Sequence, residues 1–172
     1  MENLRYPIGK FSRPEKLNQG IITNWINQIE TLPERFRKEA EHLSPLQLDT
    51  AYRPGGWTIR QLIHHVPDSH INSYIRFHWT LTENAPKIKA YNEAAWAELP
   101  YLKTLDINTS LDLLSIIHKR WVQLLKSLTQ DDLKRSFIHP DNNQSYPLRE
   151  VIGMYAWHGE HHLAHIGLVS KS

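Results

Sequence analysis

The stretch Trp157–Gly167, WHGEHHLAHIG, decides the fold because it sets histidines into a helical apolar pattern near the end of the chain. Positions 151, 155, 158, 162, 165 and 169 alternate steps of four and three, which is the seam of a packed helix. His158, His162 and His165 therefore occupy positions where leucine would be expected, and His161 lies on the flank. A helix with such a seam needs partner helices to cover it.

Three earlier segments show the same helical spacing of apolar residues. The first begins near Gln19 and contains Pro33, where we expect a kink or a break. The second follows Thr58, which starts a capping box, and runs to about Glu83 with a bend at Pro67. The sequence thus predicts two amphipathic helices before the middle of the chain.

The third helix is expected to begin at Thr109, after a long connection over residues 84–108 that lacks clear periodicity. A crossover of that length suits helices that are not antiparallel neighbours. Residues 136–146 read as a loop or a small hairpin, and Pro147 suits the first turn of the last helix. The sequence therefore predicts an all-α fold, a four-helix bundle with one long crossover.

The composition is that of an ordinary globular protein, with 40% hydrophobic and 22% charged residues. The length suits one domain over residues 1–172, with residues 1–17 as an irregular arm. A net charge of +2 is too small to indicate a nucleic-acid partner. No apolar stretch is long enough for a bilayer and no signal-peptide core is visible, so we expect a cytoplasmic protein with no membrane partner.

The histidines on the seam point to a metal. Several imidazoles on one buried face are costly unless a common partner satisfies their nitrogens, and a divalent cation does so. His158 and His162 are four residues apart, a spacing at which two rings converge on one ion. The second helix should supply the facing ligand. His70 lies within its apolar stripe and His65 at the edge, and periodicity leaves both open because Pro67 disturbs the phase.

Other polar residues near the seam read as structural. Gly159 follows His158, so the run is not the H-E-x-x-H helix of a metalloprotease. Glu160 lies about 200° around the helix from His158, which predicts a solvated surface residue and not a general base. A lone histidine on an apolar face, as His70, His118 and His139 are taken singly, is expected to be a hydrogen-bonded core residue or to lie at the surface. With no cysteine in the chain, a metal must be held by His, Asp or Glu.

GGWTIRQLIHHVPDSH at residues 55–70 and WHGEHHLAHIG at residues 157–167 together resemble the DinB superfamily, in particular its YfiT-like branch of metal-dependent hydrolases. The resemblance implies a bundle of up-down-down-up order and a divalent metal held by three histidines. Carried onto this chain, the ligand of the second helix matches His65. The pair on the last helix matches His158 and His162. The resemblance also implies a homodimer.

Three histidine ligands leave a coordination position for water or substrate, so we expect hydrolysis of an unknown small-molecule substrate. We expect one metal per chain, zinc first, with nickel, cobalt or manganese as alternatives. Asp68 and His165 are candidates for supporting the ligands from behind.

Two other functions stay open at this point. Relatives in the superfamily include thiol S-transferases, and a metal also activates thiols by deprotonating them. A non-catalytic metal-binding stress-response protein is the second alternative. Its mark would be a coordination sphere closed by a fourth protein ligand, such as His165 or His70.

Overall fold

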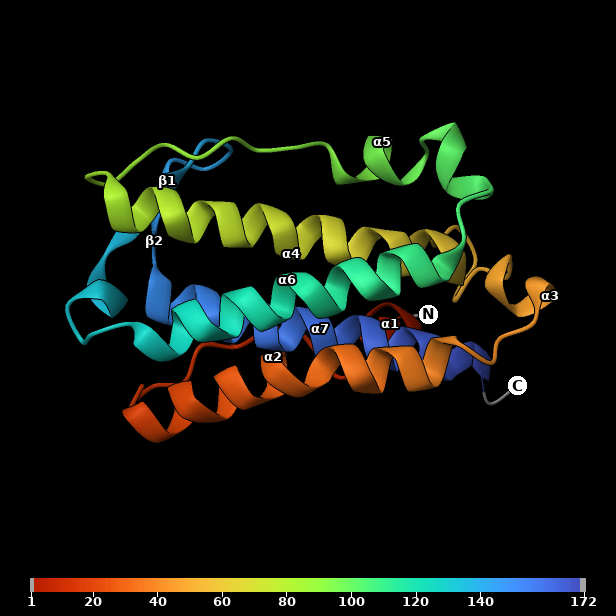
Figure 1. Cartoon of the computed structure of the whole chain (residues 1–172), viewed down its shortest axis with the longest axis horizontal. Coiled ribbons are helices and arrows are strands. Elements are labelled where there is room, and N and C mark those ends of the chain that lie inside the picture. The colour runs from red at the N-terminus through yellow and green to blue at the C-terminus, as the bar shows by residue number, and fades with distance from the viewer. Residues whose placement is uncertain (1, 171–172) are drawn as a thin grey trace.

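The computed structural model describes residues 2–170, and four long helices packed side by side form its body (Figure 1). These helices are α2 (Gln19–Ala40), α4 (Ile59–Thr82), α6 (Ile107–Ser127) and α7 (Leu148–Ser170). Followed along the colour scale, α2 and α7 run in one direction and α4 and α6 in the other. The predicted up-down-down-up bundle is confirmed. In it α7 packs against both α2 and α4, and α6 packs against the same two helices from the other side.

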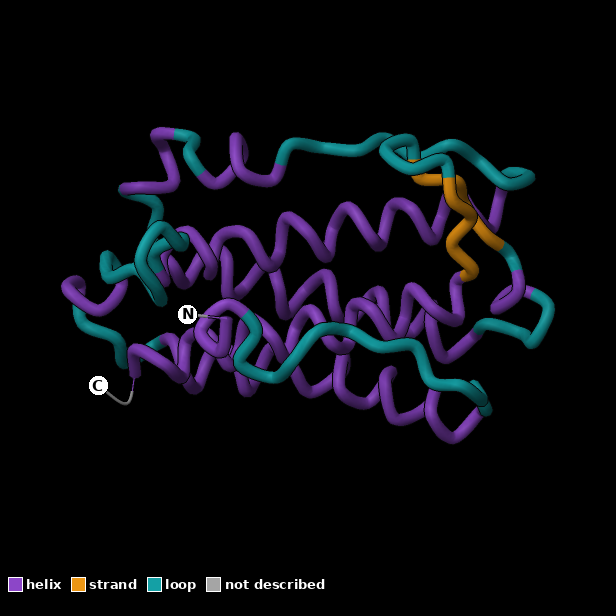
Figure 2. The backbone as a smooth tube through the Cα atoms, turned by 180° about the vertical axis from the view of Figure 1, so that it is seen from behind, coloured by secondary structure: helices purple, strands orange, loops and turns teal. Residues whose placement is uncertain are grey.

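Short elements occupy the connections between the long helices. They are α1 (Glu2–Arg5), α3 (Pro45–Leu48), α5 (Glu93–Ala97), the 3-10 turns η1 (Pro100–Lys103) and η2 (Asp132–Lys134), and the antiparallel strands β1 (Ser136–His139) and β2 (Gln144–Pro147). The arm predicted to be irregular thus contains one helical turn, and Figure 2 shows this arm along the outside of the bundle. Pro147 ends β2, so the last helix begins one residue after the predicted position.

Neither interior proline breaks its helix. α2 continues through Pro33 and α4 through Pro67. A helix-interior proline costs about 3 kcal/mol, whereas α2 buries several large apolar side chains, each worth about 1.5–3 kcal/mol. The alternative of a break at Pro33 is therefore wrong, because packing outweighs the lost hydrogen bond.

The predicted start of the third helix was two residues late. α6 begins at Ile107, and the carboxylate of Asp106 accepts the backbone N–H of Asn108. An aspartate cap of this kind satisfies one of the free donors at a helix start. The second helix begins where predicted, with the Thr58–Gln61 capping box in place.

The apolar core is divided into two clusters by a layer of histidines. One cluster surrounds Trp121 and Ile152, and the other surrounds Phe36 and Ile166. On α4, α6 and α7 the clusters occupy opposite ends of the helix, and between them fall His70, His118 and His158. Within residues 2–170 no helix has the length and apolar character needed to cross a bilayer.

Candidate metal centre

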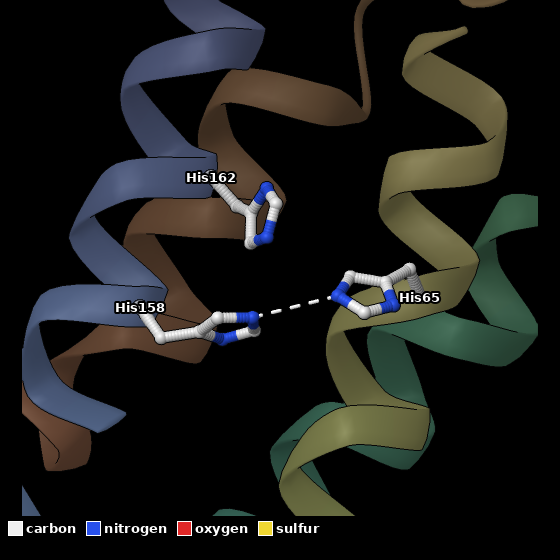
Figure 3. A group of neighbouring side chains, drawn as sticks. All are labelled: His65, His158 and His162. Carbon is white, nitrogen blue, oxygen red and sulfur yellow. Dashed lines mark hydrogen bonds between the residues drawn. The ribbon is translucent and has the colours of Figure 1, made fainter. Parts of the chain in front are cut away.

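Three imidazole rings meet in the space between α4 and α7. One ring nitrogen from each of His65, His158 and His162 lies within 4.8 Å of the others. Figure 3 shows His65 approaching from α4 and the other two rings from successive turns of α7. The Nε2 atoms of His65 and His158 are 3.4 Å apart. Two nitrogens bound to one tetrahedral zinc at about 2.0–2.1 Å would lie about 3.4 Å apart, so this spacing suits a shared cation.

Burial keeps these three rings neutral at physiological pH. It lowers the pKa of His65 to about 4. Burial, with smaller contributions from neighbouring imidazoles, holds the pKa of His158 and of His162 well below the ordinary value. Neutral imidazole is the form that offers a lone pair to a metal. The donor set therefore fits a divalent cation in both geometry and protonation.

A hydrogen-bonded inner chain determines which nitrogen of His158 carries the proton. Its members are His158, His70, His118 and the backbone carbonyl of Ile29. The ring nitrogens are 3.1 Å apart between His158 and His70 and 2.7 Å apart between His70 and His118. His118 Nδ1 lies 2.6 Å from the carbonyl oxygen.

The tautomers of the inner chain follow from its last member. A carbonyl only accepts, so His118 Nδ1–H donates to Ile29, and His118 Nε2 must accept. A neutral imidazole has one donor nitrogen and one acceptor nitrogen. Because His118 Nε2 accepts, His70 donates through Nδ1–H, and His70 Nε2 is then the acceptor. His158 donates through Nδ1–H, which leaves the Nε2 lone pair facing His65.

The sequence of α2 explains why the Ile29 carbonyl is available. The residue four positions later is Pro33, which has no N–H and whose ring crowds the carbonyl of residue i−4. The carbonyl therefore lacks its usual helical donor and accepts from His118. Pro33, which the sequence predicts only as a helix kink or break, thus frees the Ile29 carbonyl to act as the last acceptor of the inner chain.

An outer chain holds the other ring of α7, and it consists of His162, His165 and the carbonyls of Leu4 and Arg5. The Nδ1 atoms of the two histidines are 3.4 Å apart. His165 Nε2 lies 3.1 Å and 3.3 Å from the two carbonyl oxygens. By the same reasoning Nε2–H of His165 donates to the arm, and His162 donates through Nδ1–H, which leaves its Nε2 lone pair unused. Both carbonyls belong to the last turn of α1, where helix carbonyls lack helical donors.

The two residues that would close the coordination sphere under the non-catalytic alternative are already engaged. Both nitrogens of His70 are used in the inner chain. Both nitrogens of His165 are used in the outer chain. Neither ring can complete the coordination sphere without breaking its own hydrogen bonds, so a cation here would keep a position for water or substrate.

Two cavities adjoin the three rings. The larger, about 590 Å³, includes His158, Trp157 and Glu93 in its lining. The smaller, about 300 Å³, shares these three residues and also borders His65 and His162. A small molecule therefore has room beside the candidate metal position.

Several residues considered from sequence lie elsewhere. Asp68 is half-buried and lines neither cavity, its carboxylate forms no hydrogen bond to the three rings, and burial raises its pKa to about 6. Its supporting role stays a prediction. Glu160 pairs with Arg35 of α2, as suits a residue outside the site. His161 is buried, not merely on the flank, and its Nδ1 has no partner in the described part of the chain.

The sequence offers no prediction of the residues at the far ends of the inner and outer hydrogen-bond chains. Of the two placements predicted for His118, the structure shows the hydrogen-bonded core one, and its connection to His158 through His70 has no counterpart in the prediction. The terminal acceptors are backbone carbonyls, which no side-chain pattern marks. Only Pro33 marks one of these carbonyls in the sequence. A proline inside a helix has no N–H to donate to the carbonyl of residue i−4, which here is Ile29.

Comparison with known proteins places these features in a wider group. A model of the DinB superfamily matches residues 28–166. A Bacillus cereus protein (strain AH820) with the provisional name of a metal-dependent hydrolase is 52% identical over 171 residues, covering 99% of this chain and 98% of its own. A Bacillus anthracis protein (strain CDC 684) with the same provisional name has the same identity and coverage.

Two solved structures share the fold. The structure of YfiT from Bacillus subtilis, described as a probable metal-dependent hydrolase with an unusual four-helix bundle topology, matches with a TM-score of 0.95 and 46% identity. The match covers 98% of this chain and 97% of that one. A mycothiol-dependent maleylpyruvate isomerase matches with a TM-score of 0.67 and 18% identity over 85% of this chain and 60% of its own. The second likeness concerns the fold alone.

Proposed function

The chain belongs to the DinB superfamily, and on that premise we propose that it is a metal-dependent hydrolase whose cation is held by His65, His158 and His162. The observation that carries the proposal is the convergence of one nitrogen from each ring within 4.8 Å. The provisional names of the relatives and the description of YfiT support the same reaction class.

When bound, a divalent cation would supply Lewis-acid chemistry, activating water and polarising a carbonyl or phosphoryl group. The residues of the protein orient the metal ligands. His70 and His165 hold the α7 rings with their lone pairs turned toward the cation, which is the usual task of groups behind metal ligands. The cavity beside His158 receives the substrate. In the overall reaction water adds to the electrophilic atom, the bond to the leaving oxygen or nitrogen breaks, and the leaving group gains a proton.

Zinc is the metal we propose, because three imidazoles with an open position are typical of catalytic zinc. Nickel, cobalt and manganese accept the same ligands, so elemental analysis of protein purified without added metal decides the identity. The homodimer and the cytoplasmic location stay predictions, and light scattering of the purified chain tests the first.

The test of function compares turnover with metal content across a panel of esters, amides and phosphate esters. We expect hydrolysis in the loaded wild type, its loss after chelation, and its loss together with the metal in His162→Ala. His42→Ala is the matched control, because the His42 side chain is 82% exposed. A fully loaded protein that hydrolyses nothing in the panel would contradict the proposal, and conjugation of a thiol to an electrophile would replace it by a transferase.

A further inference from the structure

The larger cavity beside the three rings contains a buried positive charge that has no counterion among residues 2–170. Arg76 of α4 is 7% exposed and lines the same cavity as His158. Within residues 2–170 its hydrogen bonding amounts to one long contact, 3.4 Å to the carbonyl oxygen of Lys89, and its Nε has no acceptor. A buried guanidinium whose Nε–H has no acceptor and whose one acceptor is distant is costly. The site therefore calls for an acceptor that carries negative charge.

A second buried donor faces the same cavity. The hydroxyl of Tyr91 forms no well-defined hydrogen bond among the described residues, and Ser69 is the hydroxyl side chain that interacts with it. Burial raises the pKa of Tyr91, against smaller lowering effects from Ser69 and Arg76, so the phenol keeps its proton. A carboxylate or phosphate satisfies such donors, because its oxygens accept from a guanidinium fork and from a hydroxyl together.

The acidic residues of the cavity do not neutralise Arg76. Glu93 and Asp141 line the cavity but are exposed to solvent. Neither forms an ion pair with the guanidinium, and Asp141 instead lies 3.7 Å from Nδ1 of His139. The negative charges therefore occupy the solvent side of the cavity, whereas the positive charge is buried.

The cavity also connects the arginine to the candidate metal position. Ser69 and Arg76 both line it and are about 10 Å apart along α4 by the helical rise. Ser69 is next to His70, which contacts His158. A ligand whose anionic end contacts Arg76 can thus extend toward the three rings.

We propose that this cavity binds an anionic group of the substrate, a carboxylate or a phosphate, through Arg76 and Tyr91, and directs the hydrolysable bond toward His158. The substrate class is then a small ester, amide or phosphate ester with a second anionic group several bonds away. The assignment of a reaction rests on the proposed function, but anion binding at Arg76 does not depend on turnover.

The test titrates glutarate and inorganic phosphate separately into the zinc-loaded full chain by calorimetry. We expect saturable binding of at least one probe, and the probe that binds identifies the anion. Arg76→Gln should weaken this binding at least about 30-fold, because one partner of a buried charged contact is lost. Tyr91→Phe should weaken it about tenfold. Arg120→Gln, which removes an exposed arginine of α6, should bind like the wild type.

Equal binding in wild type and Arg76→Gln would place the anion elsewhere, the metal included, and would overturn the proposal. Absence of saturable binding for both probes would also overturn it. If Arg76→Gln does not fold, the result for Tyr91→Phe decides.

Hydrolysis separates this proposal from the proposed function. Arg76→Gln should raise KM for the 4-nitrophenyl hemiester of glutaric acid at least about 30-fold and leave KM for the neutral 4-nitrophenyl butyrate unchanged. Equal changes for both esters count against the anion site. Arg76-dependent binding of a probe without hydrolysis of either ester keeps the anion site and overturns the proposed function alone.

Discussion

The two α7 rings at the candidate metal centre are held by different parts of the molecule. The inner chain behind His158 runs through the bundle, and its contacts measure 3.1, 2.7 and 2.6 Å. The outer chain behind His162 runs to the N-terminal arm, and its contacts measure 3.4, 3.1 and 3.3 Å. Because the inner contacts are shorter and lie between the two apolar clusters, we expect the inner chain to hold its ring more firmly.

Both hydrogen-bond chains end on backbone carbonyls that local structure deprives of helical donors, one for the inner chain and two for the outer chain. Pro33 does this for the inner chain, and the end of α1 does it for the outer chain. The two hydrogen-bond chains differ in whether their acceptors form together with the bundle. The inner acceptor forms with the bundle itself, whereas the outer acceptor depends on docking of a short terminal segment, which can detach without global unfolding.

The largest expected effect comes from breaking the inner chain in the middle. His70→Leu leaves both the Nδ1–H of His158 and the Nε2 of His118 without partners. We expect metal affinity to fall up to about 100-fold, at the upper end for groups behind a ligand. Competition with a chromophoric chelator measures it, and His78→Leu, exposed on the same helix, is the control. Unchanged affinity would mean that the inner chain does not support the ligand.

Acid should destabilise the metal-free protein through the buried rings. The pKa is lowered by burial to about 4 for both His65 and His118, against about 6.5 in an unfolded chain. Between these values the unfolded state binds more protons, so the free energy of unfolding falls as pH falls, by about 1.4 kcal/mol per pH unit for each such ring. Denaturant titrations between pH 7 and pH 4.5 check this. A flat profile would show that the rings are not buried in the neutral form.

Breaking the outer chain should cost less. We expect either His165→Leu or removal of residues 2–9 to weaken metal binding about tenfold, the lower end for such supports. Both changes interrupt the same hydrogen-bond chain, so the double variant should lose no more metal affinity than either single variant. Losses that multiply in the double variant would show that the arm and His165 act separately.

The smallest effect tests the role of the proline. Pro33→Ala gives the Ile29 carbonyl a backbone donor that competes with His118. We expect metal affinity to fall about threefold, below the range for direct supports, while thermal stability holds or rises because α2 regains a hydrogen bond. Affinity that rises together with stability would contradict the proposed use of this carbonyl.

Part of this arrangement was predictable from residues alone. The alternation of three and four along the last helix gave the seam, and with it the inward placement of His158, His162 and His165, of which the last two are buried and His158 is half-buried. Periodicity could not decide between His65 and His70 because Pro67 lies between them, and in the structure both contact His158. His65 faces its Nε2 and His70 its Nδ1. Distinguishing these two positions requires coordinates.

The remaining features depend on contacts between distant segments. The inner chain joins residues from four helices, and the outer chain joins α7 to the arm. A single sequence carries no signal for such meetings. The position of Arg76 on its helix is compatible both with a residue facing the cavity and with an ordinary polar one, so its burial without an ion pair among the described residues required coordinates.

The central claim is that one cation is shared between α4 and α7, and the adjacent histidines of α4 offer the most direct test. His65 faces the α7 rings, whereas its neighbour His64 contacts the Ser110 hydroxyl at 2.8 Å. Metal per chain should be measured by mass spectrometry for wild type, His65→Ala and His64→Ala, each confirmed as folded by circular dichroism. We expect one metal in wild type and His64→Ala and none in His65→Ala. A full metal complement in His65→Ala would contradict the claim.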